Sequence, residues 1–148
     1  MALEYRLVLA GSTPVELVAE RAMPDPADRP TGTPPLLSAA LWDQYGFELT
    51  VRSGRNGYVE IESAAGTWEW EPKTYVSLTF RMDKFADPDH NVPAMLTAVR
   101  RVLESGTEDA ALTLNIDTLL LTRFAGDLLK YDQDWWTHSA GADQIIPG

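Results

Sequence analysis

The stretch FELTVRSGRNGYVEIES, residues 47–63, decides the fold of this chain. Apolar and polar residues alternate over residues 47–52, and they alternate again over residues 58–62 after the turn SGRNG. An apolar residue at every second position is typical of a β-strand that buries one face. The Asn-Gly pair at 56–57 is the strongest short hairpin signal. The stretch therefore predicts two strands that pair in an antiparallel hairpin.

The alternation continues on both sides of this hairpin. Gly11 ends a first strand, and a turn at residues 64–66 leads into the strand WEWE, which Pro72 terminates. Strands that follow one another directly along the chain favour antiparallel pairing. Further strands are expected at residues 3–9, 68–71, 75–82, 112–114, 119–124 and 128–131.

Two amphipathic helices are expected among the strands. The first begins at Thr13, which has a glutamate three residues later as in a capping box, and it ends before Pro24. The second begins near Asn91, with Pro93 in its first turn, and it ends at Gly106. Both carry apolar residues in a single helical stripe. Each helix is therefore expected to bury one face.

A proline-rich segment, residues 24–35, follows the first helix. It holds five of the ten prolines and predicts an extended loop inside a single domain that spans residues 1–148. Its length fits a binding loop, and it fits a surface strap without a function equally well. A short helix is expected next, with Ser38 as its cap and Gly46 as its left-handed end.

These elements predict an α+β fold. We expect a mainly antiparallel sheet of about six or seven strands, with the two main helices packed on one face. The opposite face of the sheet is expected to be solvated, because the strands alternate so regularly. The side chains expected on that solvated face are Glu48, Tyr58, Glu60, Glu62, Tyr75 and Arg81.

The chain carries a net charge of −10 and no cysteine. An acidic surface disfavours nucleic acid, because it cannot replace the counterions of the phosphates. It can steer a basic protein partner, and it also serves solubility alone. No apolar run approaches the roughly 20 residues that span a bilayer, and the N-terminus lacks the pattern of a signal peptide. A cytoplasmic location without a membrane partner is therefore expected.

The stretch WEWEP places two carboxylates close together. In a strand, Glu69 and Glu71 point the same way and lie roughly 6.5–7 Å apart, a separation that also suits a glycosidase pair. Such pairs normally need a deep cleft, whereas strands with a solvated face favour an acidic strip that is solvated or binds a protein. No catalytic residue is predicted. The candidate partner-binding residues are Tyr58, Glu60, Glu62, Glu69, Glu71 and Tyr75.

Four tryptophans support a second interpretation. Trp68 and Trp70 share the strand face opposite the glutamates, and Trp135 and Trp136 stand near the C-terminus. Packing in the core explains all four, because large apolar side chains stabilise the fold by burial. The alternative is a stacking platform for a small molecule or a carbohydrate, which requires at least two of these rings to line a pocket.

A group of polar residues precedes the second helix, at Asp83, Asp87, Asp89 and His90. Oxygen ligands suit calcium, but the spacing and the missing glycine do not match a calcium-binding loop. Carboxylates at this place commonly form turns and complement the helix dipole. The sequence also lacks the usual nucleophile and zinc motifs. No metal, cofactor or enzymatic activity is therefore predicted.

Several stretches together carry a resemblance to a known family. They are MALEYRLVLAG, RPTGTPPLLSAALWDQYGF, GRNGYVEIES followed by WEWEP, YVSLTFRMDKF, and the terminal WW with GADQIIPG. Over nearly the whole chain, this pattern resembles the third class of bacterial Sit-type immunity proteins. The resemblance implies a cytoplasmic protein that binds and neutralises a cognate protein toxin. It transfers no catalytic residue to this sequence.

Overall fold

The computed structural model describes residues 3–63 and 66–148. Within them the chain forms an eight-stranded sheet in the order β10-β9-β8-β1-β7-β4-β3-β2, and every neighbouring pair is antiparallel. The predicted α+β class and antiparallel sheet are confirmed. The strands are β1 (Glu4–Ala10), β2 (Thr31–Thr33), β3 (Leu36–Leu41), β4 (Phe47–Arg55), β7 (Thr74–Met82), β8 (Ala110–Leu114), β9 (Thr118–Phe124) and β10 (Asp127–Lys130).

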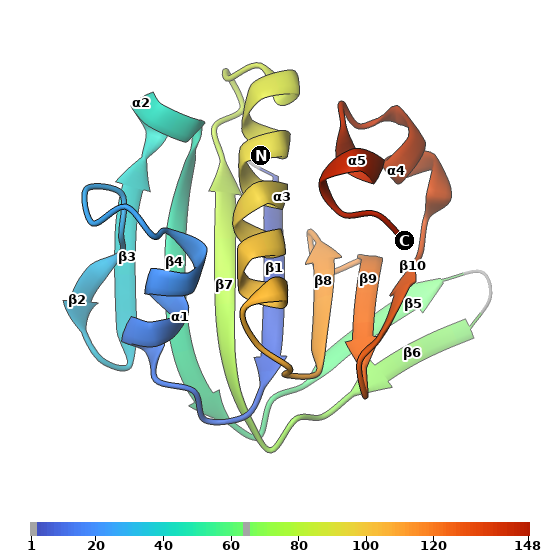
Figure 1. Ribbon diagram of the computed structural model, residues 1–148. Coiled ribbons are helices and arrows are strands. Elements are labelled where there is room, and N and C mark those ends of the chain that lie inside the picture. Colours follow the sequence, from blue (N-terminus) through green and yellow to red (C-terminus); the bar gives the residue numbers. More distant parts are fainter. Residues whose placement is uncertain (1–2, 64–65) are drawn as a thin grey trace.

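The helices cover one face of this sheet (Figure 1). Two of them are long enough to present an apolar stripe, α1 (Val15–Ala22) and α3 (Pro88–Glu104). Two short helices near the C-terminus, α4 (Gln133–His138) and α5 (Ala142–Ile145), lie on the same face. In the described part of the chain, no helix is long and apolar enough to cross a membrane.

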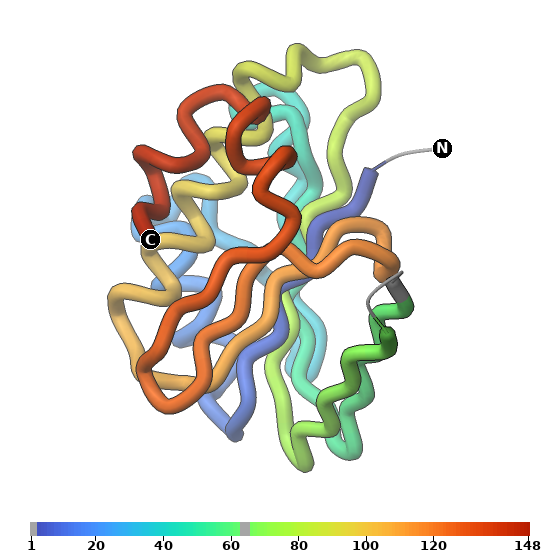
Figure 2. The backbone as a smooth tube through the Cα atoms, turned by 90° about the vertical axis from the view of Figure 1, so that its right-hand side faces the viewer, coloured from blue at the N-terminus to red at the C-terminus, as the bar shows by residue number. Residues whose placement is uncertain are grey.

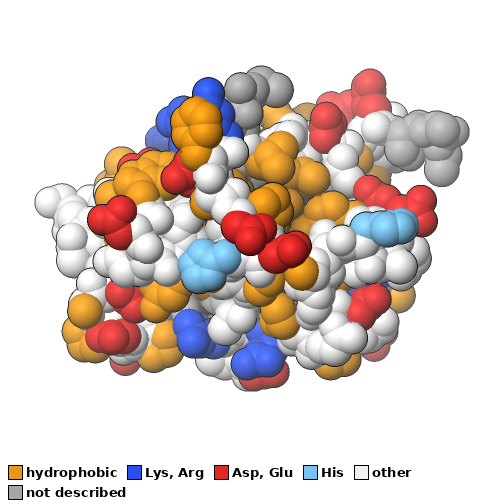
Figure 3. Space-filling view, turned by 90° about the horizontal axis from the view of Figure 1, so that it is seen from above, with side chains coloured by type: hydrophobic (Ala, Val, Ile, Leu, Met, Phe, Trp, Pro, Cys, Tyr) orange, Lys and Arg blue, Asp and Glu red, His pale blue; other side chains and the backbone are white. Residues whose placement is uncertain are grey.

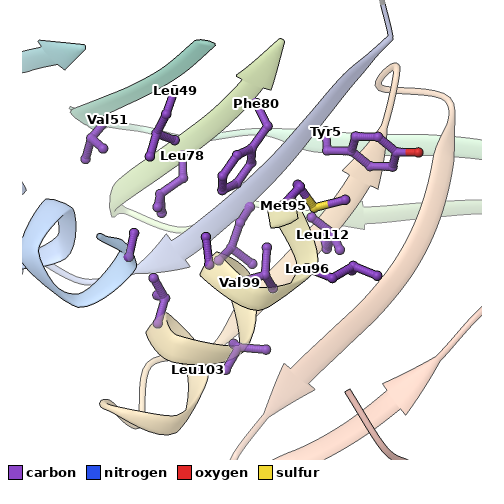
Figure 4. Packing of buried hydrophobic residues seen from close by; sticks show 14 of the residues in the cluster. Tyr5, Leu49, Val51, Leu78, Phe80, Met95, Leu96, Val99, Leu103 and Leu112 are labelled. Atoms are coloured by element: carbon purple, nitrogen blue, oxygen red, sulfur yellow. The ribbon is translucent and has the colours of Figure 1, made fainter. Parts of the chain in front are cut away.

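The main core lies between the sheet and these helices. Side chains from β1, β4, β7 and β8 point towards α3, as Figure 4 shows for Leu49, Phe80 and Leu112. Met95 and Val99 of α3 are fully buried against them. Each such side chain contributes about 1.5–3 kcal/mol through burial. The apolar faces of the strands and the apolar stripe of α3 therefore pack against each other in one layer.

The hairpin expected from residues 47–63 does not form, and that prediction is wrong. β4 pairs instead with β7, from Phe47 opposite Met82 to Arg55 opposite Thr74. The backbone N–H of Asn56 then donates to the Lys73 carbonyl at 2.7 Å. Asn56 has a φ of 54°, which turns the chain out of the sheet. The Asn-Gly signal thus marks an exit from the sheet.

Residues 58–71 form a separate element, which we call the arm. It consists of β5 (Val59–Ser63) and β6 (Gly66–Trp70), paired with each other in a two-stranded sheet. The turn predicted at residues 64–66 lies partly outside the described residues. Figure 2 shows the helices on one side of the main sheet and the arm on the other. The arm crosses behind β8 and β9 (Figure 1).

Apolar contacts hold the arm against the main sheet. Ile61 packs in a small cluster with Ala111 and Leu119. The Trp68 and Trp70 rings lie 6.3 and 5.2 Å from the Phe124 ring, measured between centroids. The expectation of a second sheet face solvated throughout is therefore wrong over β8 and β9. A two-stranded hairpin is marginal by itself, so the arm gains stability by covering these strands.

Two predicted helix starts are also wrong in detail. The Thr13 hydroxyl does not cap α1, because it donates to Glu108 Oε2 at 3.0 Å. The helix α3 begins at Pro88, and its cap is Asp87, whose carboxylate accepts from the Asp89 N–H at 2.9 Å. Pro93 consequently lies inside the helix. At α1 the predicted cap bonds to a distant residue instead, and at α3 the cap lies four residues before the predicted start at Asn91.

The segment before β4 differs from the expected loop and helix. Part of the proline-rich loop pairs as β2 with β3, so residues 24–35 are not all irregular. Ser38 does not cap a helix, because it lies in β3 and faces Thr50 of β4. Only α2 (Trp42–Tyr45) is helical. Its predicted left-handed end at Gly46 is confirmed, with a φ of 75°.

An ion pair ties α1 to the loop before β8. The Arg21 guanidinium donates from Nη1 to Glu108 Oε2 at 2.6 Å and from Nη2 to Oε1 at 2.9 Å. Its Nη2 also donates to the Val102 carbonyl near the end of α3. The two charged side chains are only 9% and 13% exposed. The hydrogen bonds from Arg21 and Thr13 lower the pKa of Glu108 to about 2.

We expect Glu108→Gln to lower the free energy of unfolding by about 1–3 kcal/mol at pH 7, because the Arg21 guanidinium loses its charged partner. The pKa of Glu108 falls from an ordinary value of about 4.5 to about 2 in the folded state. Its stabilisation is therefore complete above pH 4.5 and disappears as the pH falls towards 2. Urea unfolding at pH 7 and pH 3 measures both effects. The control is Glu104→Gln, whose side chain is 71% exposed.

Candidate partner-binding site

The strand pairing of the arm separates its residues onto two faces. Val59 lies opposite Trp70 and Ile61 lies opposite Trp68, and these four side chains form the inner face. On the outer face, Glu60 lies directly opposite Glu69. Like charges at directly opposite positions destabilise a pair of strands. The arm therefore keeps an exposed acidic pair that its own stability does not favour.

Tyr58 joins this acidic pair. Its side chain is 50% exposed, and its hydroxyl donates to Glu60 Oε2 at 2.7 Å. This hydrogen bond, together with the negative charges of Glu60 and Glu69, raises the pKa of the Tyr58 hydroxyl to about 12. We call Tyr58, Glu60, Glu62 and Glu69 the acidic face of the arm.

The other two candidate residues lie elsewhere. Glu71 follows the last residue of β6 and is exposed. Tyr75 lies in β7 of the main sheet, where its ring occupies the space left by two glycines. A Cβ atom on Gly54 would lie 2.6 Å from the Tyr75 hydroxyl oxygen, and one on Gly57 would lie 2.8 Å from its ring. Tyr75 therefore has a packing role that the alternation did not reveal.

The four tryptophans form two separate pairs. Trp68 and Trp70 are half-buried on the inner face of the arm. Trp136 is buried in the main core on the helical side, where its indole N–H donates to the Leu120 carbonyl at 2.9 Å. The Trp135 ring lies 4.9 Å from Trp136 and 5.9 Å from Tyr5. The four rings thus do not share one platform.

A cavity of about 450 Å³ opens between the arm and the main sheet. We call it the arm pocket. Sequence reasoning missed it, because its walls combine the arm with residues about 50 to 70 positions later. No local pattern brings such segments together. The pocket is lined by Ile61, Gly66, Thr67, Trp68, Thr118, Leu119, Tyr131 and Asp132.

The polar residues around the start of α3 contact other parts of the protein chain. Asp87 caps the helix, and Asp83 accepts a hydrogen bond from the Phe85 N–H at 2.9 Å. His90 Nε2 lies 3.3 Å from the Gln44 carbonyl oxygen. Over residues 3–63 and 66–148, no group of three or more His, Cys, Asp or Glu side chains is arranged to hold a metal ion.

The described residues therefore form an α+β protein with an antiparallel main sheet and a separate two-stranded arm. The comparison with protein families is more specific. A family model described as SitI3-like matches residues 3–140, and the chain therefore belongs to the SitI3-like family. The resemblance found in the sequence is confirmed. The curated proteins and the solved structures gave no match to this chain.

We predict that Glu60→Gln lowers the pKa of Tyr58 from about 12 towards its ordinary value of 10. The substitution removes the charge that a tyrosinate at position 58 would repel, and it weakens the hydrogen bond that holds the proton. Titration of the Tyr58 ring carbon by NMR measures the change. Glu62→Gln is the control, because Glu62 does not contribute to this shift. A Tyr58 pKa that stays near 12 in Glu60→Gln contradicts the assignment.

Proposed function

We propose that this protein is an immunity protein that binds and neutralises a cognate bacterial toxin in the cytoplasm, without catalysis of its own. Membership of the SitI3-like family supports an immunity role in general. The observation that carries the proposal is the acidic face of the arm. It is held on a separate element, and no lysine or arginine occurs between Arg55 and Lys73.

Charge suggests the kind of toxin that this surface fits. The chain carries a net charge of −10. In the view from above, acidic side chains are spread over the surface, whereas lysines and arginines gather at two places on its outline (Figure 3). Complementary charges raise the association rate and orient the approaching partner. The proposed partner is therefore a basic protein toxin that meets the acidic face of the arm.

The first test is protection. A strain that expresses the cognate toxin should grow only when this protein is also expressed, and the two proteins should form a one-to-one complex. Growth arrest that this protein does not relieve contradicts the immunity role.

The second test locates the contact. The triple variant Glu60→Lys, Glu62→Lys and Glu69→Lys should lower the association rate roughly tenfold or more at low salt, because it reverses the attraction. Stopped-flow fluorescence measures this rate at several ionic strengths. The matched control carries Glu16→Lys, Glu20→Lys and Glu104→Lys, which change the same charge at exposed sites on α1 and α3. Equal rates for both variants would remove the arm as the contact surface.

The arm pocket favours a second candidate function, the binding of a small molecule or a carbohydrate beside Trp68. Its volume of about 450 Å³ lies in the range of ligand sites. Of the four tryptophans that suggested such a platform, only Trp68 lines this pocket. A screen of sugars and small metabolites by tryptophan fluorescence tests this function. A saturable response that Trp68→Leu abolishes and Trp70→Leu preserves supports it.

A further inference from the structure

We propose that the arm pocket binds a guanidinium or ammonium group carried on an apolar stem, and that it receives an arginine or lysine side chain of the partner. The second part of this proposal rests on the proposed function. The first part concerns the pocket alone and is argued from its walls, its rim and its charge.

The walls of the pocket suit an apolar stem. Ile61 of the arm and Leu119 of β9 both line the pocket, and these residues are only 5% and 8% exposed. The half-buried Trp68 ring adds an aromatic surface from the arm. Long cationic side chains bury their methylene groups along such surfaces and keep the charged group near water.

Two aromatic rings and one carboxylate suit the charged end. Trp68 and Tyr131 both line the pocket. The Tyr131 hydroxyl lies 3.4 Å from Thr122 Oγ1, which fixes that end of the ring against the main sheet. A cation gains by lying over an aromatic face. These rings can therefore hold a guanidinium without a direct ion pair.

Asp132 supplies the complementary charge. It is an exposed residue at the edge of the pocket, immediately before α4, with a φ of 53°. Among the described residues, no hydrogen bond or ion pair engages its carboxylate. None of the residues that line the pocket is basic. An anion would thus meet repulsion at the rim, whereas a cation meets a carboxylate with no other partner.

The acidic face beside the arm pocket also favours a cationic ligand. Thr67 lines the pocket and lies opposite Glu62 of the acidic face. A basic segment on the arm can therefore place one cationic side chain in the pocket and others against the glutamates. Arginine is the better occupant, because its guanidinium is weakly hydrated and stacks on aromatic rings. Arginine is also enriched among the residues that dominate the energy of protein interfaces.

The pocket can be tested without the toxin. Four probes share one hexyl stem: hexylguanidinium, hexylammonium, hexanol and heptanoate. We expect saturable shifts of the Trp68 indole N–H signal in NMR spectra of the whole chain with the two cations. Hexanol should bind roughly threefold to tenfold more weakly, and heptanoate more weakly still. The buried Trp136 indole is the internal reference and should not shift.

A conservative variant isolates the charge. Asp132→Asn keeps the shape of the side chain and tolerates the left-handed backbone. It should weaken both cations roughly threefold to tenfold and leave hexanol unchanged. The matched control is Asp134→Asn, which changes an exposed carboxylate that does not line the pocket. Equal affinities for hexanol and hexylguanidinium, or cation binding that Asp132→Asn does not weaken, would overturn the proposal.

A competition experiment with the toxin then shows whether the pocket binds a free cation or a side chain of the toxin. If the pocket receives a toxin residue, hexylguanidinium competes with the toxin, and Asp132→Asn speeds dissociation of the complex. If hexylguanidinium binds and does not compete, the pocket accepts a free cation and the assignment to the partner is wrong. If the probes bind but the protein does not protect against the toxin, the immunity function is wrong and the cation-binding pocket is supported. If the protein protects but the probes do not bind, the immunity function is supported and the cation-binding pocket is wrong.

Discussion

The pairing of β4 with β7 is the constraint on which the remaining structure depends. Its last backbone hydrogen bonds, from Asn56 to Lys73 and from Gly57 to Pro72, close the pair at its base. Residues between these points cannot pair with β4 or β7, because the neighbours of these strands are already β3 and β1. The arm instead pairs within itself as a separate two-stranded sheet. The acidic face and the arm pocket both follow from this exclusion.

The sequence predicted the antiparallel sheet and its helical layer correctly, but not the arm that covers part of the other sheet face. Alternation at β1 and β7, and apolar stripes in α1 and α3, are local signals that burial enforces. The hairpin predicted for residues 47–63 was wrong, because an Asn-Gly pair indicates a turn but does not determine which strands pair on either side of it. The glutamates at 60 and 69 share a face as the two-residue period requires. The pocket depends on Tyr131 and Asp132, which no local signal joins to the arm.

The two faces of the main sheet carry apolar clusters of very different size. The helical face holds the large core, in which Leu78, Phe80 and Val99 are fully buried. The opposite face holds a small cluster under the arm, with Ile61, Ala111 and Leu119 as its buried members. Local opening costs least where few apolar contacts must be broken. The arm can therefore adjust to a partner while the helical core keeps its packing.

In the proposed complex, the acidic face and the arm pocket would act on different steps of one binding event. Exposed glutamates act at a distance, and salt screens them over about 8–10 Å, so they mainly affect encounter. A side chain held between Trp68 and Leu119 must leave an apolar site before the complex separates, so the pocket mainly affects dissociation. A toxin–immunity pair that used both would combine fast capture with slow release. The alternation in the arm sends carboxylates to its outer face and apolar side chains to its inner face, where Ile61 and Trp68 line the pocket together with Leu119 of β9.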